Sequence, residues 1–341
     1  MPLSDIPGQP RAVAALQSAL ASHSVHHAYL FAGPSGVGKE ATAIALAQAL
    51  LCGVQPDQGC GTCLTCTRVA KLGHPDVTLV LPEDEQVRRG RAGRSDFDHV
   101  PSREIRVEQI RLLQERLSFR GLESKRKFVL IALAEQMNPQ AQNALLKTLE
   151  EPPPDTTIAL VCSAPDRLLS TVRSRCSRLQ FGPLPEAMLM EALGAGKTLD
   201  AGTAGLLATL AGGSLTRALE MDPEQLADRK ELYTKFEAMT AEDLRTVLRF
   251  SEAFGASRDA AEAALQLLTV WLRDLALLQA GSEQIANRDL LELARSSAAK
   301  RSPESLHRSN ALVEKARFAI TVRNGGARLQ LERMLLEMGE G

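Results

Sequence analysis

Aromatic residues are scarce in this chain of 341 residues, which has nine Phe, two Tyr and one Trp. Proteins that bind single-stranded nucleic acid stack successive bases on aromatic side chains, so the composition argues against that class. An excess of charge is lacking too, since 40 Lys and Arg residues oppose 41 Asp and Glu residues and the net charge is −1. The chain therefore has no general attraction to nucleic acid or anionic membranes, and any DNA contact must be local or shared with partners.

Long apolar runs and an export signal are also lacking. No stretch of about 18 apolar residues occurs, and the opening segment MPLSDIPGQP has neither the basic nor the apolar region of a signal peptide. We therefore expect a cytoplasmic protein without a membrane partner. Hydrophobic residues at 44% and charged residues at 24% are typical of a folded chain. At roughly 150 residues per domain, the length predicts two domains, or three if one is small.

Short apolar, β-rich runs alternate with helical patterns in the first half of the chain, which indicates a parallel sheet. Strands are expected near residues 28–32, 77–81, 128–133, 157–162 and 178–181. Most of these are nearly continuous apolar runs, as in strands that helices cover on both faces. The sequence thus predicts a doubly wound α/β domain.

After Pro183, Ala- and Leu-rich segments with helical spacing predict helices only. Leu265, Leu268, Leu272 and Leu275 form one apolar stripe, and Leu329 to Leu336 repeat the pattern. Residues 83–100 stand out in the first half because charged residues lie among glycines with hardly an apolar side chain. We expect an exposed, mobile insertion whose arginines could touch phosphate, although a solvated loop is the favoured interpretation.

A phosphate-binding motif follows the first expected strand, and a helix rich in Ala and Leu comes next. The glycines of such a loop let backbone N–H groups surround a phosphate at the helix N-terminus, and Lys39 would reach the outer phosphates. The candidate nucleotide-binding residues are Gly33, Ser35, Gly36, Val37, Gly38, Lys39 and Glu40.

Two departures from the motif argue against hydrolysis. Glu40 stands where Ser or Thr would give its hydroxyl to Mg²⁺. The third expected strand runs into Ala132 and Leu133, where an NTPase needs acids to hold the metal and orient water, and Glu135 comes too late to replace them. We predict that ATP is not hydrolysed. Binding of ATP or ADP, and a loop that keeps its shape without nucleotide, both remain open.

Four cysteines follow the first helix of the motif with the spacing C-x7-C-x2-C-x2-C, and they are Cys52, Cys60, Cys63 and Cys66. Each C-x2-C segment can turn back to present both sulfurs to one tetrahedral Zn²⁺. Disulfides are not expected in a reducing compartment. The cluster predicts a structural zinc, while Cys162 ends an apolar strand and is expected in the core.

Together with further motifs, these features resemble the clamp loader subunits of bacterial DNA polymerase III, which belong to the AAA+ family, and among them the delta prime type. The further matching stretches are Gly8-Gln9, HHAYLF at 26–31, His74-Pro75-Asp76, NALLKTLEEP at 143–152 and Ser174-Arg175-Cys176. The resemblance covers about the first 220 residues, and the helical tail is similar in length and character only.

The resemblance implies a role for two arginines. Arg175 looks like an arginine finger that reaches ATP on the neighbouring subunit, because a planar guanidinium pairs with a γ-phosphate through two N–H groups. The alternative is a surface arginine beside Arg173 and Arg178. Arg217 matches the family's second sensor, which touches the subunit's own nucleotide. Ser163 lies near the first sensor position, and the alternative is a serine that opens a turn.

The resemblance also implies an architecture and partners. We expect an α/β AAA+ domain with a RecA-like sheet at 1–182, including the cysteine knuckle at 52–66, a small helical lid at 183–219 and an all-helical collar domain at 220–341. The implied partners are the gamma/tau and delta subunits, and through the complex the sliding clamp and primed DNA. Two alternatives stay open: a gamma/tau-type motor ATPase, and a zinc-containing scaffold or DNA-binding module with a vestigial phosphate loop.

Overall fold

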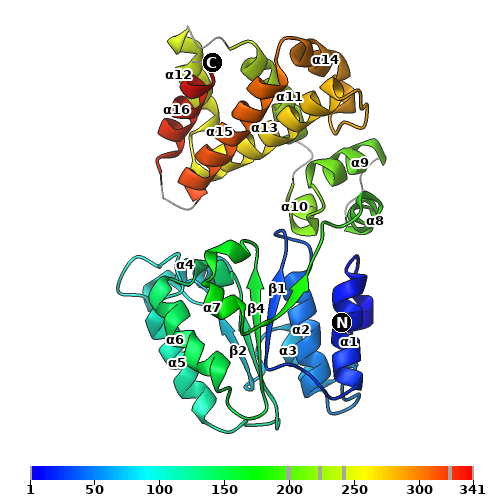
Figure 1. The fold of residues 1–341 in the computed structure, drawn as a ribbon, viewed down its shortest axis with the longest axis vertical. Helices are drawn as coiled ribbons and strands as arrows, with labels where there is room; N and C mark the ends of the chain where they lie inside the picture. Colours follow the sequence, from blue (N-terminus) through cyan, green and yellow to red (C-terminus); the bar gives the residue numbers. More distant parts are fainter. Residues whose placement is uncertain (1, 197–200, 222–224, 240–242, 322–324, 340–341) are drawn as a thin grey trace. The chain divides into compact units, whose positions relative to one another are not determined.

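The computed structural model describes residues 2–196, 201–221, 225–239, 243–321 and 325–339. The chain divides into two compact units, Met1–Ala192 with Gly212–Arg217, and Leu193–Ala211 with Ala218–Gly341. The first unit holds the sheet and the second is helical (Figure 1). The boundaries expected near residues 182 and 219 stay a prediction.

The first unit is built on one parallel sheet, as predicted. Its strands are β1 (Ala28–Ala32), β2 (Val77–Val80), β3 (Lys127–Ile131), β4 (Thr156–Cys162) and β5 (Ser177–Gln180). They lie in the order β2-β3-β4-β1-β5, and every neighbouring pair is parallel. The inner strands β1 and β4 are buried along their whole length, whereas the edge strands β2 and β5 are partly exposed.

Alternate residues of β1 pack on opposite faces of the sheet, because successive side chains of a strand point in opposite directions. Tyr29 and Phe31 join the core formed with α1 (Pro10–Ala21) and α2 (Lys39–Leu51). Ala28 and Leu30 join the core formed with α5 (Val107–Ser118) and α6 (Pro139–Glu150). Figure 1 shows these helix pairs on the two sides of the sheet. The predicted fold class is confirmed.

The short helices of this unit are α3 (Leu64–Ala70), α4 (Glu83–Arg88) and α7 (Ser170–Arg173). The prediction of an exposed loop over residues 83–100 is wrong for its first part, because residues 83–88 form helix α4. Glu83 and Glu85 are buried there. A segment with hardly an apolar residue can be buried when its carboxylates are satisfied, and Glu85 accepts hydrogen bonds from Arg88 and Arg89.

Helices account for the described part of the chain after Glu186, as predicted. They are α8 (Glu186–Gly196), α9 (Ala201–Leu210), α10 (Leu215–Glu220), α11 (Gln225–Glu237), α12 (Leu244–Phe254), α13 (Arg258–Gln279), α14 (Leu291–Ala299), α15 (Pro303–Thr321) and α16 (Ala327–Gly339), joined in part by a short 3-10 turn. None of the helices in the described ranges is long and apolar enough to span a membrane.

The core of the second unit is centred on α13. All four leucines of the predicted stripe, Leu265 to Leu275, are buried there, and Trp271 stacks on Tyr233 of α11 with ring centroids 4.5 Å apart. In α16 the buried face is formed by Leu331, Met334 and Leu335. Leu329, expected on that face, is 67% exposed, because it lies on the other side of the helix.

Candidate functional site

The phosphate loop, residues 33–40, joins β1 to α2 at the carboxyl edge of the sheet, where open parallel sheets bind ligands. Lys39 is buried, and its Nζ donates hydrogen bonds to the carbonyl oxygens of Gly33, at 2.7 Å, and Pro34. It also donates to Ser163 Oγ at 3.1 Å, just beyond the end of β4. The structure thus brings together the motif lysine and the residue near the first sensor position.

Two glycines of the loop are required by contacts with the protein itself. A Cβ on Gly33 would lie 2.3 Å from the carbonyl oxygen of Phe181, and one on Gly36 would lie 2.0 Å from Ser214 Oγ. The carbonyl oxygen of Gly36 also accepts a hydrogen bond from the N–H of Leu215 at 2.8 Å. These contacts within the protein help to hold the loop in its shape.

Gln9 is a buried side chain at this loop whose role the sequence did not indicate. Its Nε2 donates to the carbonyl oxygens of Val37, at 3.2 Å, and Gly182, at 2.8 Å. Its Oε1 accepts from the N–H of Gly182 at 3.2 Å. The amide ties the start of the chain to the phosphate loop and to Gly182, two residues beyond the end of β5. The only signal in the sequence is the family-like pair Gly8-Gln9.

Glu40, the unusual residue of the motif, is held by an arginine. Nη1 and Nη2 of Arg89 donate to its two carboxylate oxygens at 2.7 and 3.2 Å, and Nε of Arg89 donates to Glu85 at 2.6 Å. Mg²⁺ needs oxygen ligands that are free to coordinate it. Because Glu40 is paired and Ala132 and Leu133 carry no oxygen on their side chains, these positions do not fit a metal held as in a motor ATPase.

Glu135 lies nearer the loop than its place in the sequence suggested. The chain turns back at Leu133, whose φ is 54°, and continues in a short 3-10 helix, Ala134–Gln136. The charge of Glu135 acts on two buried groups. Burial lowers the pKa of Lys39, and the charge of Glu135 counteracts this decrease. Burial raises the pKa of Cys162 to about 12, and the charge of Glu135 adds to this increase. Among the described residues, Oε2 of Glu135 is buried without a hydrogen-bond partner.

The four cysteines of the knuckle converge after α2 and at the start of α3, and they could hold a metal ion. Their sulfurs all lie within 4.8 Å of one another. The Cys52–Cys60, Cys52–Cys63 and Cys60–Cys66 sulfur separations are 3.7, 3.9 and 3.9 Å. A tetrahedron with Zn–S bonds of about 2.3 Å has edges of about 3.8 Å. The cluster therefore has the size that a tetrahedral zinc requires.

Backbone N–H groups around the knuckle point at its sulfurs. Gln55, Cys63 and Cys66 donate to the sulfurs of Cys52, Cys60 and Cys63 at 3.2, 3.3 and 3.4 Å. The N–H of Cys63 lowers the pKa of the Cys60 thiol to about 6. Burial raises that of Cys66 to about 12, so its sulfur would become a thiolate only when a bound cation displaces the proton.

Arg175 lies just after α7, whose Val172 packs in the core shared with α5 and α6, and 34% of its side chain is exposed. It forms an ion pair with Glu150 at 2.5 Å and donates to the carbonyl oxygen of Thr171 at 2.9 Å. Arg217 is half-buried in the first turn of α10, and its backbone N–H donates to Ser214 Oγ at 3.3 Å. That turn is the one that contacts Gly36.

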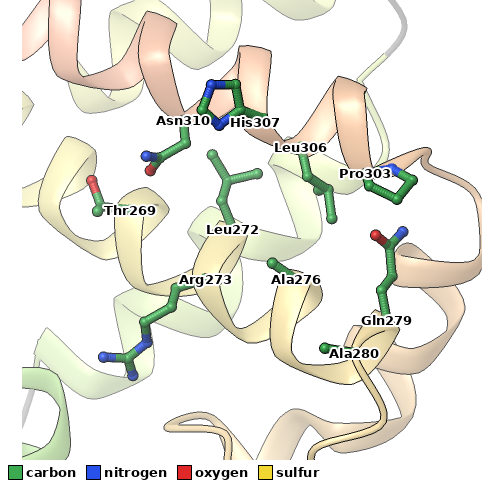
Figure 2. Close-up of a pocket in the computed structure, with 10 residues that line it drawn as sticks. All are labelled: Thr269, Leu272, Arg273, Ala276, Gln279, Ala280, Pro303, Leu306, His307 and Asn310. Atoms are coloured by element: carbon green, nitrogen blue, oxygen red, sulfur yellow. The ribbon is translucent and has the colours of Figure 1, made fainter.

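The helical unit contains a cavity of about 600 Å³ between α13 and α15. Figure 2 shows Leu272 and Leu306 between the two helices, while Arg273 points away. The described residues that line it include no Cys, Asp or Glu. The residues that the sequence predicts to bind nucleotide or metal all lie in the first unit instead.

Comparisons with known proteins agree over both units. The family described as "DNA polymerase III, delta subunit" matches residues 8–185, and "DNA polymerase III, delta subunit, C terminal" matches residues 223–340. The chain is 38% identical to DNA polymerase III subunit delta prime of Bacillus subtilis over 181 residues, which cover 53% of this chain and 50% of that protein.

Two further relatives extend this result. Subunit delta prime of Pseudomonas aeruginosa is 41% identical over 175 residues, which cover 51% of this chain and 48% of the relative. DNA polymerase III subunit tau of B. subtilis is 29% identical over 225 residues, which cover 64% of this chain and 36% of tau. The matched regions thus span about half the length of these two delta prime subunits.

Proposed function

The chain belongs to the DNA polymerase III delta prime family, and on that basis we propose that it is a clamp loader subunit that does not hydrolyse ATP. In this role it supplies Arg175 in trans to the ATP site of a gamma/tau neighbour. It also serves as a rigid stator beside gamma/tau and delta while the complex loads the sliding clamp onto primed DNA.

The observation that carries the proposal is the contrast between two sites of the first unit. Arg175 presents a partly exposed guanidinium beyond α7. The chain's own phosphate loop has its lysine bonded to loop carbonyls, its Glu40 paired with Arg89, and no acid at positions 132 and 133. A cation that stabilises phosphoryl transfer is thus available to a neighbour, while the strand end beside this chain's own loop carries no acid at the two positions that would hold the metal and orient water.

Zinc in the knuckle is proposed to be structural. Four cysteine sulfurs complete a tetrahedron, which leaves no open position for a water or substrate. If ATP or ADP binds the phosphate loop, Gly33, Ser35, Gly36, Val37, Gly38, Lys39 and Glu40 would contact it, with Arg217 from α10 as the second sensor. The helical domain from about residue 220 is proposed to join the collar of the complex.

Replacement of Arg175 in the reconstituted complex tests the proposal. We expect Arg175→Ala to slow single-turnover ATP hydrolysis at the neighbouring site by about 10³-fold, the usual effect of an arginine finger. Size-exclusion chromatography should show an intact complex. Arg178→Ala is the matched control, since Arg178 is an exposed arginine on the adjacent strand β5, and its complex should hydrolyse ATP normally. An unchanged rate in Arg175→Ala would remove the finger.

A motor ATPase of the gamma/tau type is the second candidate, and the position of Glu135 near Lys39 favours it. The purified chain decides between the two. ATP turnover that is lost in both Lys39→Ala and Glu135→Gln would establish a hydrolase and overturn the proposal. The remaining candidate, a DNA-binding scaffold, requires a salt-sensitive affinity of the isolated chain for primed DNA.

A further inference from the structure

Arg175 is fixed at two points by its own chain. One is Glu150, the last residue of α6, whose Oε1 lies 2.5 Å from Nη2. The other is the carbonyl oxygen of Thr171 in α7, which accepts from Nη1 at 2.9 Å. The two contacts engage different nitrogens, so together they restrict rotation of the guanidinium plane.

Electrostatics favours the pairing of Arg175 with Glu150. A carboxylate at the end of a helix is opposed by the negative end of the helix dipole, and a cation there is favoured. Glu150 occupies such an end, and Arg175 is the cation beside it. The pair adds little to stability because 34% of the Arg175 side chain and 49% of the Glu150 side chain are exposed to water. Orientation of the guanidinium is what the pair can provide.

The helix that carries Glu150 is itself held in place. Asn138 caps α6 by accepting from the N–H of Ala141 at 2.8 Å. The side chain of Gln142 donates to the carbonyl oxygens of Met137 and Arg167, and accepts from the N–H of Leu169 at 2.7 Å. These bonds fix α6 to the segment that leads into α7, so Glu150 and Thr171 keep a constant spacing.

The guanidinium retains capacity for a ligand. It carries five N–H donors in one plane, and among the described residues only Glu150 and Thr171 accept hydrogen bonds from it. The other donors remain for an oxygen of a phosphate, which guanidinium groups bind through two parallel hydrogen bonds. The chain thus holds Arg175 from one side and leaves donors of the same group free.

We propose that Glu150 is a positioning residue for Arg175, and this rests on the proposed role of Arg175 as a finger. Glu150 holds the guanidinium in the orientation in which its remaining N–H groups meet the terminal phosphate of a nucleoside triphosphate on the neighbouring subunit. A Gln at position 150 keeps the size of the side chain and removes the charge that fixes this orientation.

The test uses the full complex with Glu150→Gln in this chain. A misplaced catalytic group lowers the rate of the chemical step by roughly tenfold to a hundredfold. We therefore expect kcat at the neighbouring site to fall by that factor, with the KM for ATP and assembly of the complex unchanged. Asp166→Asn is the matched control, because it breaks the nearby Arg173–Asp166 pair of 3.0 Å without touching Arg175.

The outcomes separate this inference from the proposed function. If Arg175→Ala slows hydrolysis but Glu150→Gln behaves like Asp166→Asn, the finger stands and the positioning role of Glu150 is wrong. A faster reaction in Glu150→Gln also overturns it, because Glu150 would then compete with the phosphate. A slower reaction that comes from a higher KM for ATP, or from failed assembly of the complex, also overturns the positioning role of Glu150. If Arg175→Ala has no effect, the proposed function itself fails.

Discussion

Asp76 joins two parts of the sheet, and its replacement by Asn should make the protein easier to unfold. Its carboxylate is buried and accepts three backbone hydrogen bonds, from the N–H groups of Leu122, Glu123 and Ser124 at 2.6, 2.9 and 2.7 Å. It thereby fixes the turn before β3 to the residue that precedes β2. Asn has the same shape, but its NH₂ group would face N–H donors that need an acceptor.

The magnitude follows from these contacts. A hydrogen bond to a charged group contributes about 1.5–3 kcal/mol, and Asn can replace only part of the three, so Asp76→Asn should lower the free energy of unfolding by about 3 kcal/mol. Urea unfolding followed by far-UV circular dichroism measures it. Asp166→Asn, at a side chain that is 99% exposed, should stay within about 0.5 kcal/mol of the parent.

The effect of Asp76→Asn should depend on pH. Burial by itself would raise the pKa of Asp76, but the three backbone N–H groups lower it below its usual range. A carboxyl whose pKa is lower in the folded state contributes stability that is complete above its unfolded pKa of about 4 and is lost as the pH falls through its folded value. The difference between parent and variant should therefore shrink on acidification from about pH 7 to pH 3. A difference below about 1 kcal/mol at neutral pH, or one that acid leaves unchanged, would refute the reasoning.

Two other predictions concern the knuckle and the helical unit. Cys66→Ser should abolish the zinc content of the purified chain, measured by mass spectrometry, whereas Cys176→Ser should retain it. Equal zinc content in the two variants would exclude the knuckle as the zinc site. Asp274 is fully buried and accepts from the N–H groups of Ala286 and Asn287 and from Asn287 Nδ2, at 3.0, 2.8 and 2.7 Å. Asp274→Ala should lower the free energy of unfolding of this unit by about 3–5 kcal/mol, as followed by Trp271 fluorescence, and a change below about 1 kcal/mol would contradict the role of this network.

Local patterns predicted most of the fold. Each strand lies within two residues of its expected position, because a run of apolar residues between helical patterns suffices to identify a buried parallel strand. The leucine stripe from Leu265 to Leu275 predicted the buried face of α13 correctly, because leucines at helical spacing gather on the one face that packs against other helices. Leu329 was misplaced because a leucine-rich segment does not show which of its sides is buried.

Contacts between distant residues could not be predicted from the sequence. Arg89 and Glu40 are 49 positions apart, and nothing near either residue indicates that they pair. Helix α4 was missed for a different reason. Glu85 pairs with Arg88 and Arg89 at helical spacing, but a charged stretch that also contains glycines is typical of an exposed loop. The approach of Glu135 to Lys39 depends on the backbone turn at Leu133, where a left-handed conformation is rare for a residue other than Gly.

The packing around Gly33 and Gly36 has a consequence for how such motifs are interpreted. Gly33 excludes a larger side chain because the carbonyl oxygen of Phe181 lies against it. Gly36 disfavours one because its φ of 74° is left-handed and Ser214 lies beside it, whatever the loop binds. The requirements of folding are then enough to preserve these two glycines, whether or not the loop takes part in nucleotide chemistry. In a chain of this kind, the acids that the strand ends lack are a better guide to catalytic competence than the glycines that the loop retains.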